Sequence, residues 1–156
     1  MPYIQFVWAG NFAFKGISEG RKEIMEHMDD LPDNVHFLGL VERDRMNEFF
    51  NMGDVMLQLS FEELFPMTIL ESMNANIPLL LRDLPEYKPI LFDYYLKANS
   101  QQTFKDELTK LKEEADYYAK ACEGSKRGEQ FYSKESILEQ WQQFYDKVAT
   151  ERNLLS

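Results

Sequence analysis

Short apolar runs alternate along the first hundred residues with segments that have the spacing of amphipathic helices. The runs at 3–9, 35–39, 54–60 and 77–81 are rich in aromatic, β-branched and leucine side chains, with few polar residues. Nearly continuous runs of this length are typical of parallel strands that are covered on both faces. We therefore predict strands at these positions.

The segments between and after these runs predict helices at about 19–29, 43–52, 66–74 and 86–92. Pro66 suits the first position of its helix, because the N–H group that proline lacks has no helical partner there. A regular alternation of strand and helix predicts an α/β fold of the doubly wound, Rossmann-like class, with helices on both faces of a parallel sheet.

The last third of the chain changes to a purely helical pattern. Apolar residues recur at spacings of three and four over 104–122, which predicts an amphipathic helix. Gly124 and Gly128 are expected to end this helix, and Ser133 is expected to cap a final one. The apolar residues of that final helix are Ile137, Trp141, Phe144 and Val148. Such spacing usually marks core packing, so we predict that both helices, and Trp8 in the first strand, pack into the core.

Composition narrows the functional classes. The 156 residues are 44% hydrophobic and 28% charged, which indicates one globular domain over 1–156. The net charge of −10 argues against a nucleic-acid partner, because an acidic surface repels phosphate backbones. The single cysteine, Cys122, cannot form an internal disulfide, and we recognise neither a membrane-spanning run nor a secretion signal. We therefore expect a cytoplasmic protein.

The segment 60–71 combines an anion-binding helix end with two carboxylates. An apolar strand ends at Ser60, and ligands of open parallel sheets bind outside the carboxyl ends of the strands. The first N–H groups of the following helix, from Met67 and Thr68, lack helical partners and carry the positive end of the helix dipole. A diphosphate would be stabilised there even in an acidic domain, because the interaction is local.

Glu63 precedes this helix, and Glu71 lies within it on the same side as Thr68. Carboxylates repel phosphate but accept hydrogen bonds from the paired hydroxyls of a sugar or a ribose. Acceptors on either side of an anion site form a template for a nucleotide diphosphosugar. Taken as an isolated pair, the two residues would more often be solvated surface charges.

The surroundings of the pair resemble a known signature. Seven residues separate Glu63 from Glu71, and a proline-led apolar strand follows. This pattern resembles the E-x7-E motif of family 4 retaining glycosyltransferases of the GT-B fold, and the segment 34–39 resembles a strand of the same family. The resemblance covers about residues 3–95. The segments 63–71 and 81–87 are most similar to the diacylglycerol α-glucosyltransferase branch of Gram-positive bacteria, which implies UDP-glucose as donor and a membrane diacylglycerol as acceptor.

The resemblance also implies roles for individual residues. Glu63 would contact the donor sugar hydroxyls at the reaction centre, and Glu71 would bind the ribose hydroxyls. The backbone that meets the sugar and the diphosphate would come from Leu64, Phe65, Pro66, Met67 and Thr68, with Leu64 standing where the family usually has glycine. The base would lie along Gly39, Leu40 and Val41. The family generally needs no metal, so no metal cofactor is expected.

The resemblance further implies that the chain is a C-terminal donor domain without the acceptor domain and without the first strand–helix unit. That strand is central in the usual order, so we expect a rearranged sheet or strand pairing with another copy of the chain. Lys15, Arg82 and Lys88 are the nearby cations available to stand in for the absent basic residues, although ordinary surface or structural roles are commoner. A membrane lipid acceptor would bind through the absent domain, with the whole enzyme at the inner membrane face.

Three functions fit these expectations. The first is the donor domain of a glycosyltransferase that moves a hexose to a lipid or glycan, inactive by itself. The second is a nucleotide-sugar-binding module without catalysis. The third is a fragment of a GT-B sugar-nucleotide epimerase, against which the E-x7-E context argues. The sequence leaves the acceptor, the hexose and the oligomeric state open.

Overall fold

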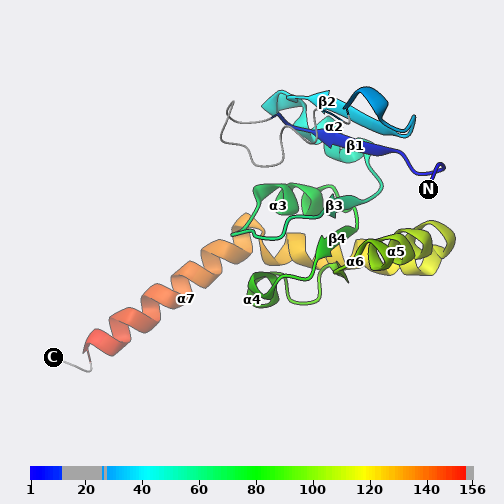
Figure 1. The fold of residues 1–156 in the computed structure, drawn as a ribbon. Helices are drawn as coiled ribbons and strands as arrows, with labels where there is room; N and C mark the ends of the chain where they lie inside the picture. The colour runs from blue at the N-terminus through cyan, green and yellow to red at the C-terminus, as the bar shows by residue number, and fades with distance from the viewer. Residues whose placement is uncertain (12–25, 27, 154–156) are drawn as a thin grey trace. The chain divides into compact units, whose positions relative to one another are not determined.

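The computed structural model describes residues 1–11, 26 and 28–153, which divide into two compact units (Figure 1). The first unit is Met1–Phe49 and the second is Phe50–Ser156. The helix predicted at 19–29 lies mostly outside the described residues, which contain its Glu26 and a 3₁₀ turn at Met28–Asp30.

The first unit contains two parallel strands, β1 (Phe6–Ala9) and β2 (Val35–Gly39). The Asn34 amide joins them at their start, because its Nδ2 donates to the carbonyl oxygens of Met1 at 3.1 Å and Ile4 at 2.7 Å. A 3₁₀ turn at Arg43–Arg45 then leads into α2 (Met46–Met52), as predicted. Trp8 was expected in the core, but it is 41% exposed, and its ring lies against that of Phe37 with centroids 5.0 Å apart.

The second unit contains a separate parallel sheet of three strands: β3 (Met56–Gln58), β4 (Leu79–Arg82) and β5 (Leu96–Ala98). Helix α3 (Met67–Asn74) connects β3 to β4, and a 3₁₀ turn at Pro85–Tyr87 with α4 (Lys88–Leu91) connects β4 to β5. The sequence predicted one sheet, whereas the described strands form two, because β1 pairs only with β2 among them. Strand β5 was not predicted, since three residues with a central lysine carry little pattern.

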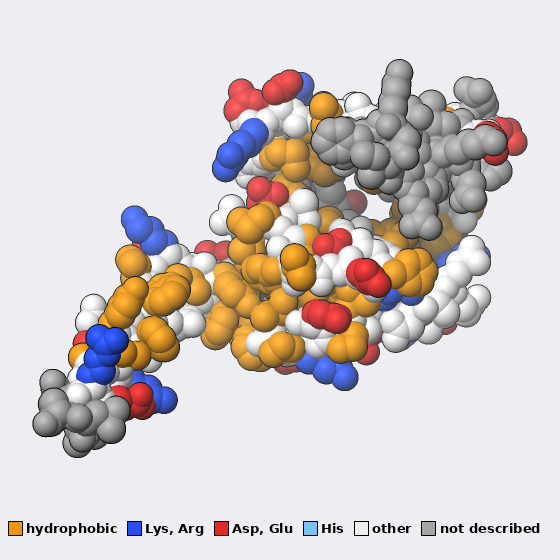
Figure 2. All heavy atoms as spheres, turned by 60° about the vertical axis from the view of Figure 1, so that its left-hand side comes forward, with side chains coloured by type: hydrophobic (Ala, Val, Ile, Leu, Met, Phe, Trp, Pro, Cys, Tyr) orange, Lys and Arg blue, Asp and Glu red, His pale blue; other side chains and the backbone are white. Residues whose placement is uncertain are grey.

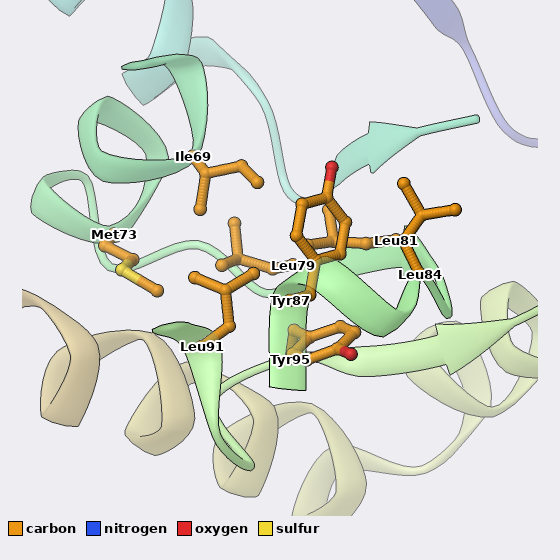
Figure 3. Packing of buried hydrophobic residues seen from close by; sticks show 8 residues of the cluster. All are labelled: Ile69, Met73, Leu79, Leu81, Leu84, Tyr87, Leu91 and Tyr95. Carbon is orange, nitrogen blue, oxygen red and sulfur yellow. The ribbon is translucent and has the colours of Figure 1, made fainter. Parts of the chain in front are cut away.

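The core of the second unit is built around β4. Leu79 and Leu81 face a cluster with Ile69 and Met73 of α3, and Figure 3 shows these side chains converging. Leu80 points to the opposite face and is also completely buried. Since alternate side chains of β4 are buried on both sides, the strand is covered on both faces, as the apolar run predicted.

Helix α6 packs directly against α3. The predicted helix end at Gly124 and Gly128 is wrong: α5 (Gln101–Glu113) ends instead before Glu114, and α6 (Ala115–Phe131) runs through both glycines. A Cβ atom on Gly128 would lie 2.6 Å from the Met73 methyl carbon, and one on Gly124 would lie 3.2 Å from the Tyr94 carbonyl oxygen. The glycines are therefore needed for close approach of the helix and do not break it.

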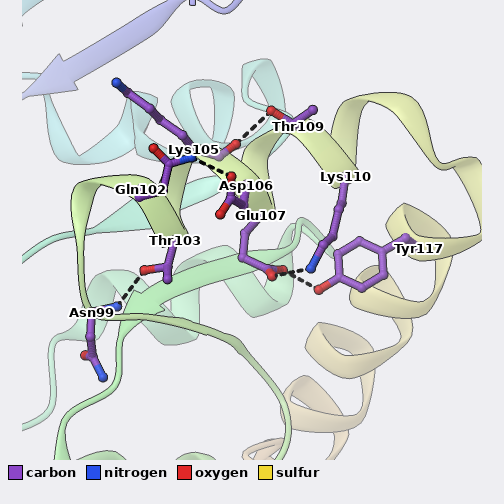
Figure 4. Close-up of polar contacts among 9 residues, drawn as sticks. All are labelled: Asn99, Gln102, Thr103, Lys105, Asp106, Glu107, Thr109, Lys110 and Tyr117. Carbon is purple, nitrogen blue, oxygen red and sulfur yellow. Dashed lines mark hydrogen bonds and ion pairs between the residues drawn. The ribbon is translucent and has the colours of Figure 1, made fainter.

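Polar contacts hold the helices around this core. The buried Ser125 hydroxyl of α6 donates to the Ile77 carbonyl oxygen at 2.6 Å, just before β4. In Figure 4, the Glu107 carboxylate of α5 accepts hydrogen bonds from Lys110 at 2.8 Å and from the hydroxyl of Tyr117 in α6. Burial and this carboxylate raise the pKa of Tyr117 to about 12.

The last helix, α7 (Lys134–Asn153), begins as predicted after Ser133, whose Oγ accepts from the Ser136 N–H at 3.2 Å. Two of its four predicted core residues are on the surface, however: Trp141 is 53% exposed and Phe144 is 54% exposed, whereas Ile137 and Val148 are half-buried. Figure 2 shows hydrophobic side chains gathered along this helix. Helical spacing correctly predicted an apolar face but could not say what covers it. None of the helices in the described residues is long and apolar enough to cross a bilayer.

The packing of α3 gives a first prediction. Met73→Ala is expected to lower the free energy of unfolding by about 2–5 kcal/mol, because a fully buried side chain would leave a cavity between α3 and α6. Met67→Ala, on the same helix but 63% exposed, is the matched control and should change it by less than about 0.5 kcal/mol. Urea unfolding followed by circular dichroism measures both. Equal losses in the two variants would contradict this packing.

Candidate functional site

The carboxyl ends of β3, β4 and β5 are tied together by one side chain. Arg82, the last residue of β4, donates from Nε to the Leu59 carbonyl oxygen at 3.0 Å and from a terminal nitrogen to that of Asn99 at 3.2 Å. Its guanidinium also lies 3.9 Å from the centre of the Phe61 ring. Arg82 therefore anchors the loop after β3 at the edge of the sheet where parallel-sheet ligands bind.

Glu63 lies in that loop, and Gln58 orients its carboxylate. Gln58 Nε2 donates to Glu63 Oε1 at 2.6 Å and to Ser60 Oγ at 2.8 Å. Both Gln58 and Glu63 are half-buried, so the hydrogen bond restrains an acceptor at the end of β3. Sequence reasoning did not select Gln58. The available signal was an amide side chain inside an apolar strand, five residues before Glu63.

The amino end of α3 begins after Pro66 and has no side-chain cap from the described residues. Pro66 is the N-cap, with φ −67° and ψ 127°, so the prediction that it occupies the first helical position is wrong by one residue. Among the described residues no side chain caps this end, and the N–H groups of Met67 and Thr68 lack helical partners. Leu64 is 91% exposed and Phe65 half-buried, so the leading end is not covered by the core.

Glu71 lies in the second turn of α3, and its side chain is exposed. The structure therefore brings Glu63, the amides of Met67 and Thr68, and Glu71 onto one loop–helix segment of the second unit. Gly39, Leu40 and Val41 belong to the first unit, so their part in the site stays a prediction. Gly39 has a φ of 71°, which favours glycine at the end of β2.

Tyr87 lies beneath this segment, completely buried after β4. Burial, followed by the negative charges of Glu63 and Glu86, raises the pKa of Tyr87 to about 12. Among the described residues, its hydroxyl is a buried side-chain group without a hydrogen-bond partner. An unpaired buried hydroxyl costs about 1–3 kcal/mol. Its neighbour Tyr95, with ring centroids 5.8 Å apart, instead donates to Asp83 Oδ1 at 3.2 Å.

The other candidates add little to the site. Lys88 is an exposed residue of α4, and Lys15 lies outside the described residues. Burial raises the pKa of the Cys122 thiol on α6. Within the residues that the structure describes, no group of three or more His, Cys, Asp or Glu side chains is placed to hold a metal ion.

Comparison with known proteins now identifies the family. Residues 4–127 match the family Glycosyl transferases group 1. The chain belongs to this family. It is 36% identical over 149 residues to the alpha-galactosylglucosyldiacylglycerol synthase of Streptococcus pneumoniae (strain ATCC BAA-255 / R6), covering 96% of this chain and 40% of that protein. It is 27% identical over 113 residues to the processive diacylglycerol alpha-glucosyltransferase of Acholeplasma laidlawii, covering 71% of this chain and 33% of that one.

The fold agrees with this membership. The crystal structure of Anabaena Alr3699/HepE in complex with UDP-glucose superimposes with a TM-score of 0.74 at 16% identity, over 96% of this chain and 42% of that one. The resemblance to glycosyltransferases and the Rossmann-like arrangement of parallel strands and helices are thus confirmed. The glycosyltransferase chain spans well under half the length of the relatives that it matches.

The buried tyrosines near the site give a prediction on pH. In the folded glycosyltransferase chain burial raises the pKa of Tyr87 to about 12, and burial and Asp83 raise that of Tyr95 further, whereas an unfolded tyrosine ionises near ~10. Above that pH the unfolded chain binds fewer protons than the folded one, so raising the pH favours unfolding.

The free energy of unfolding should therefore be insensitive to these tyrosines below about pH 10 and fall steadily as the pH rises toward about 12. Urea unfolding at a series of alkaline pH values measures this fall. Tyr87→Phe should make the fall shallower, because one of the raised groups is removed. An unchanged slope in that variant would show that Tyr87 ionises normally in the folded chain.

Proposed function

We propose that the chain is the donor-binding domain of a retaining hexosyltransferase and that its donor is a UDP-sugar, with UDP-glucose as the first candidate. The observation that carries the proposal is the pairing of a Gln58-held Glu63 with the uncapped amino end of α3. One group accepts hydrogen bonds and the other donates them, at neighbouring positions of one short segment. A nucleotide diphosphosugar needs an acceptor for its sugar hydroxyls and, beside it, donors for its diphosphate.

The donor would bind as follows. Its diphosphate takes hydrogen bonds from the N–H groups of Met67 and Thr68, where the helix dipole favours negative charge. The sugar hydroxyls donate to the Glu63 carboxylate, and the ribose hydroxyls donate to Glu71. These contacts are local, so the overall charge of −10 does not prevent them. The proposal includes no metal cofactor, because the amides of α3 stabilise the leaving diphosphate.

The proposed reaction keeps the configuration of the sugar. The acceptor hydroxyl oxygen bonds to the anomeric carbon while the bond from that carbon to the diphosphate breaks. UDP leaves with the electron pair, and the acceptor proton passes to a phosphate oxygen of the leaving group. In this scheme Glu63 orients the sugar through its hydroxyls and forms no bond to the anomeric carbon.

The relatives support the choice of substrates. Anabaena Alr3699/HepE was crystallised with UDP-glucose, and the two relatives named above are a glycolipid synthase and a diacylglycerol glucosyltransferase. We therefore propose a glycolipid acceptor of the diacylglycerol type, bound by parts of the enzyme outside this chain, with the reaction on the cytoplasmic side of the membrane. A nucleotide-sugar-binding module without catalysis would use the same donor contacts. Hexose transfer, measured on the enzyme that contains this chain, distinguishes a catalytic donor domain from a module that only binds the nucleotide sugar.

Calorimetry on this chain tests the donor site. Glu63→Gln is expected to weaken UDP-glucose binding by roughly 10- to 100-fold and to leave UDP binding unchanged, because hydrogen bonds to a charged group contribute about 1.5–3 kcal/mol. Glu71→Gln is expected to weaken both ligands by a similar factor, because both carry the ribose. Glu62→Gln, at the exposed neighbouring position, is the matched control and should change neither.

A transfer assay on the chain alone is expected to show no product, because acceptor recognition lies elsewhere. If the titrations of wild type and the two site variants coincide, the assignment of the donor site is wrong.

A further inference from the structure

The hydroxyl of Tyr87 is buried and makes no hydrogen bond to any described residue of the second unit. The residue follows β4, and none of its surface is exposed. Its ring packs in the cluster around Ile69, Leu81 and Tyr95, where a phenylalanine would fill the same space. Figure 3 shows the hydroxyl at the end of the ring that points away from Tyr95. Among the described residues this oxygen has no hydrogen-bond partner, so packing alone does not account for a tyrosine here.

The ring of Tyr87 lies on the same face of the sheet as the side chain that holds Glu63, because Gln58 pairs in register with Leu81, and Leu81 packs in the cluster of Tyr87. The charge of Glu63 contributes to the raised pKa of Tyr87, after burial itself. In the described structure Glu63 accepts a hydrogen bond from Gln58 at Oε1, which leaves Oε2 as an acceptor. The buried Tyr87 hydroxyl, which lacks an acceptor, therefore lies near the Glu63 carboxylate, whose Oε2 can accept a hydrogen bond.

We propose that Tyr87 is a positioning residue of the donor site, whose hydroxyl donates a hydrogen bond to Glu63 when a donor sugar is bound. Gln58 and Tyr87 then hold the carboxylate through its two oxygens and aim it at the sugar hydroxyls. This inference deepens the proposed function and rests on it.

The adjustment involves only the short stretch around Glu63, between the Arg82 anchor at Leu59 and Phe61 and the start of α3. Glu62 and Leu64, on either side of Glu63, are both exposed, Leu64 by 91%, so their side chains do not fix this stretch. The buried ring of Tyr87, in contrast, is fixed by its neighbours on α3 and β4 and by Tyr95, just before β5. If a bound sugar draws Glu63 toward the sheet edge, the Glu63 carboxylate therefore meets the Tyr87 hydroxyl, which is already in place. Pairing this hydroxyl favours the sugar-bound state over the state that binds UDP alone.

The test compares Tyr87→Phe with Tyr95→Phe by calorimetry with UDP and UDP-glucose. Both changes remove one hydroxyl from the same aromatic pair and keep the ring. Tyr87→Phe is expected to weaken UDP-glucose binding by roughly 5- to 10-fold, to leave UDP binding unchanged and not to lower the thermal midpoint. Tyr95→Phe, which loses its hydrogen bond to Asp83, is expected to lower the thermal midpoint and to leave both affinities unchanged.

A double variant locates the effect at Glu63. In a Glu63→Gln background, Tyr87→Phe should cause less than about a twofold further loss of UDP-glucose affinity, because the carboxylate that it positions is gone. If the wild type binds UDP-glucose and Tyr87→Phe binds it equally well, the role of Tyr87 is refuted while the donor site stands. If the wild type binds neither UDP nor UDP-glucose, the proposed function fails and this inference fails with it.

Discussion

The burial of Leu79, Leu80 and Leu81 in β4 is the constraint on which the second unit depends. Leu79 and Leu81 pack toward α3, while Leu80 packs on the other face, so helices must cover both sides of the strand. Covered parallel strands need crossover connections, and these bring the carboxyl end of each strand to one edge together with the amino end of the following helix. The loop 59–66 and the start of α3 lie at that edge because β4 cannot be left open to water.

Close packing of α6 against the buried face of α3 holds this helix in place at the same edge of the sheet. Gly124 and Gly128 let the backbone of α6 approach Tyr94 and Met73, and Ser125 bonds to the carbonyl of Ile77 before β4 begins. These contacts hold α3 by its buried face, so its amino end can stay free of side chains that would otherwise cap it. Rigid support beneath an open helix end is what an anion site requires, because donors that are already oriented need no reorganisation.

The polar groups at the carboxyl edge of the three-stranded sheet support one another. Arg82 holds the chain after β3 and β5, Gln58 holds Glu63, and Tyr87 lies buried below. Gln58 belongs to β3 and Arg82 to β4, so a slip in the register of these two strands would separate the groups. The proposed nucleotide-sugar donor would use donors and acceptors that lie side by side, since it presents both phosphate oxygens and neutral hydroxyls.

The sequence by itself determined four of the five described strands, most helices and the family, because continuous apolar runs, helical spacing and the placement of Glu63 and Pro66 before a helix are local patterns. It missed β5, read Gly124 and Gly128 as a helix end, and placed Trp141 in the core. Only the tertiary structure decided these points, and only it showed Gln58 holding Glu63 and the unpaired hydroxyl of Tyr87. The reason is physical: whether a glycine breaks a helix, an aromatic is covered or a hydroxyl finds a partner depends on neighbours distant in the chain.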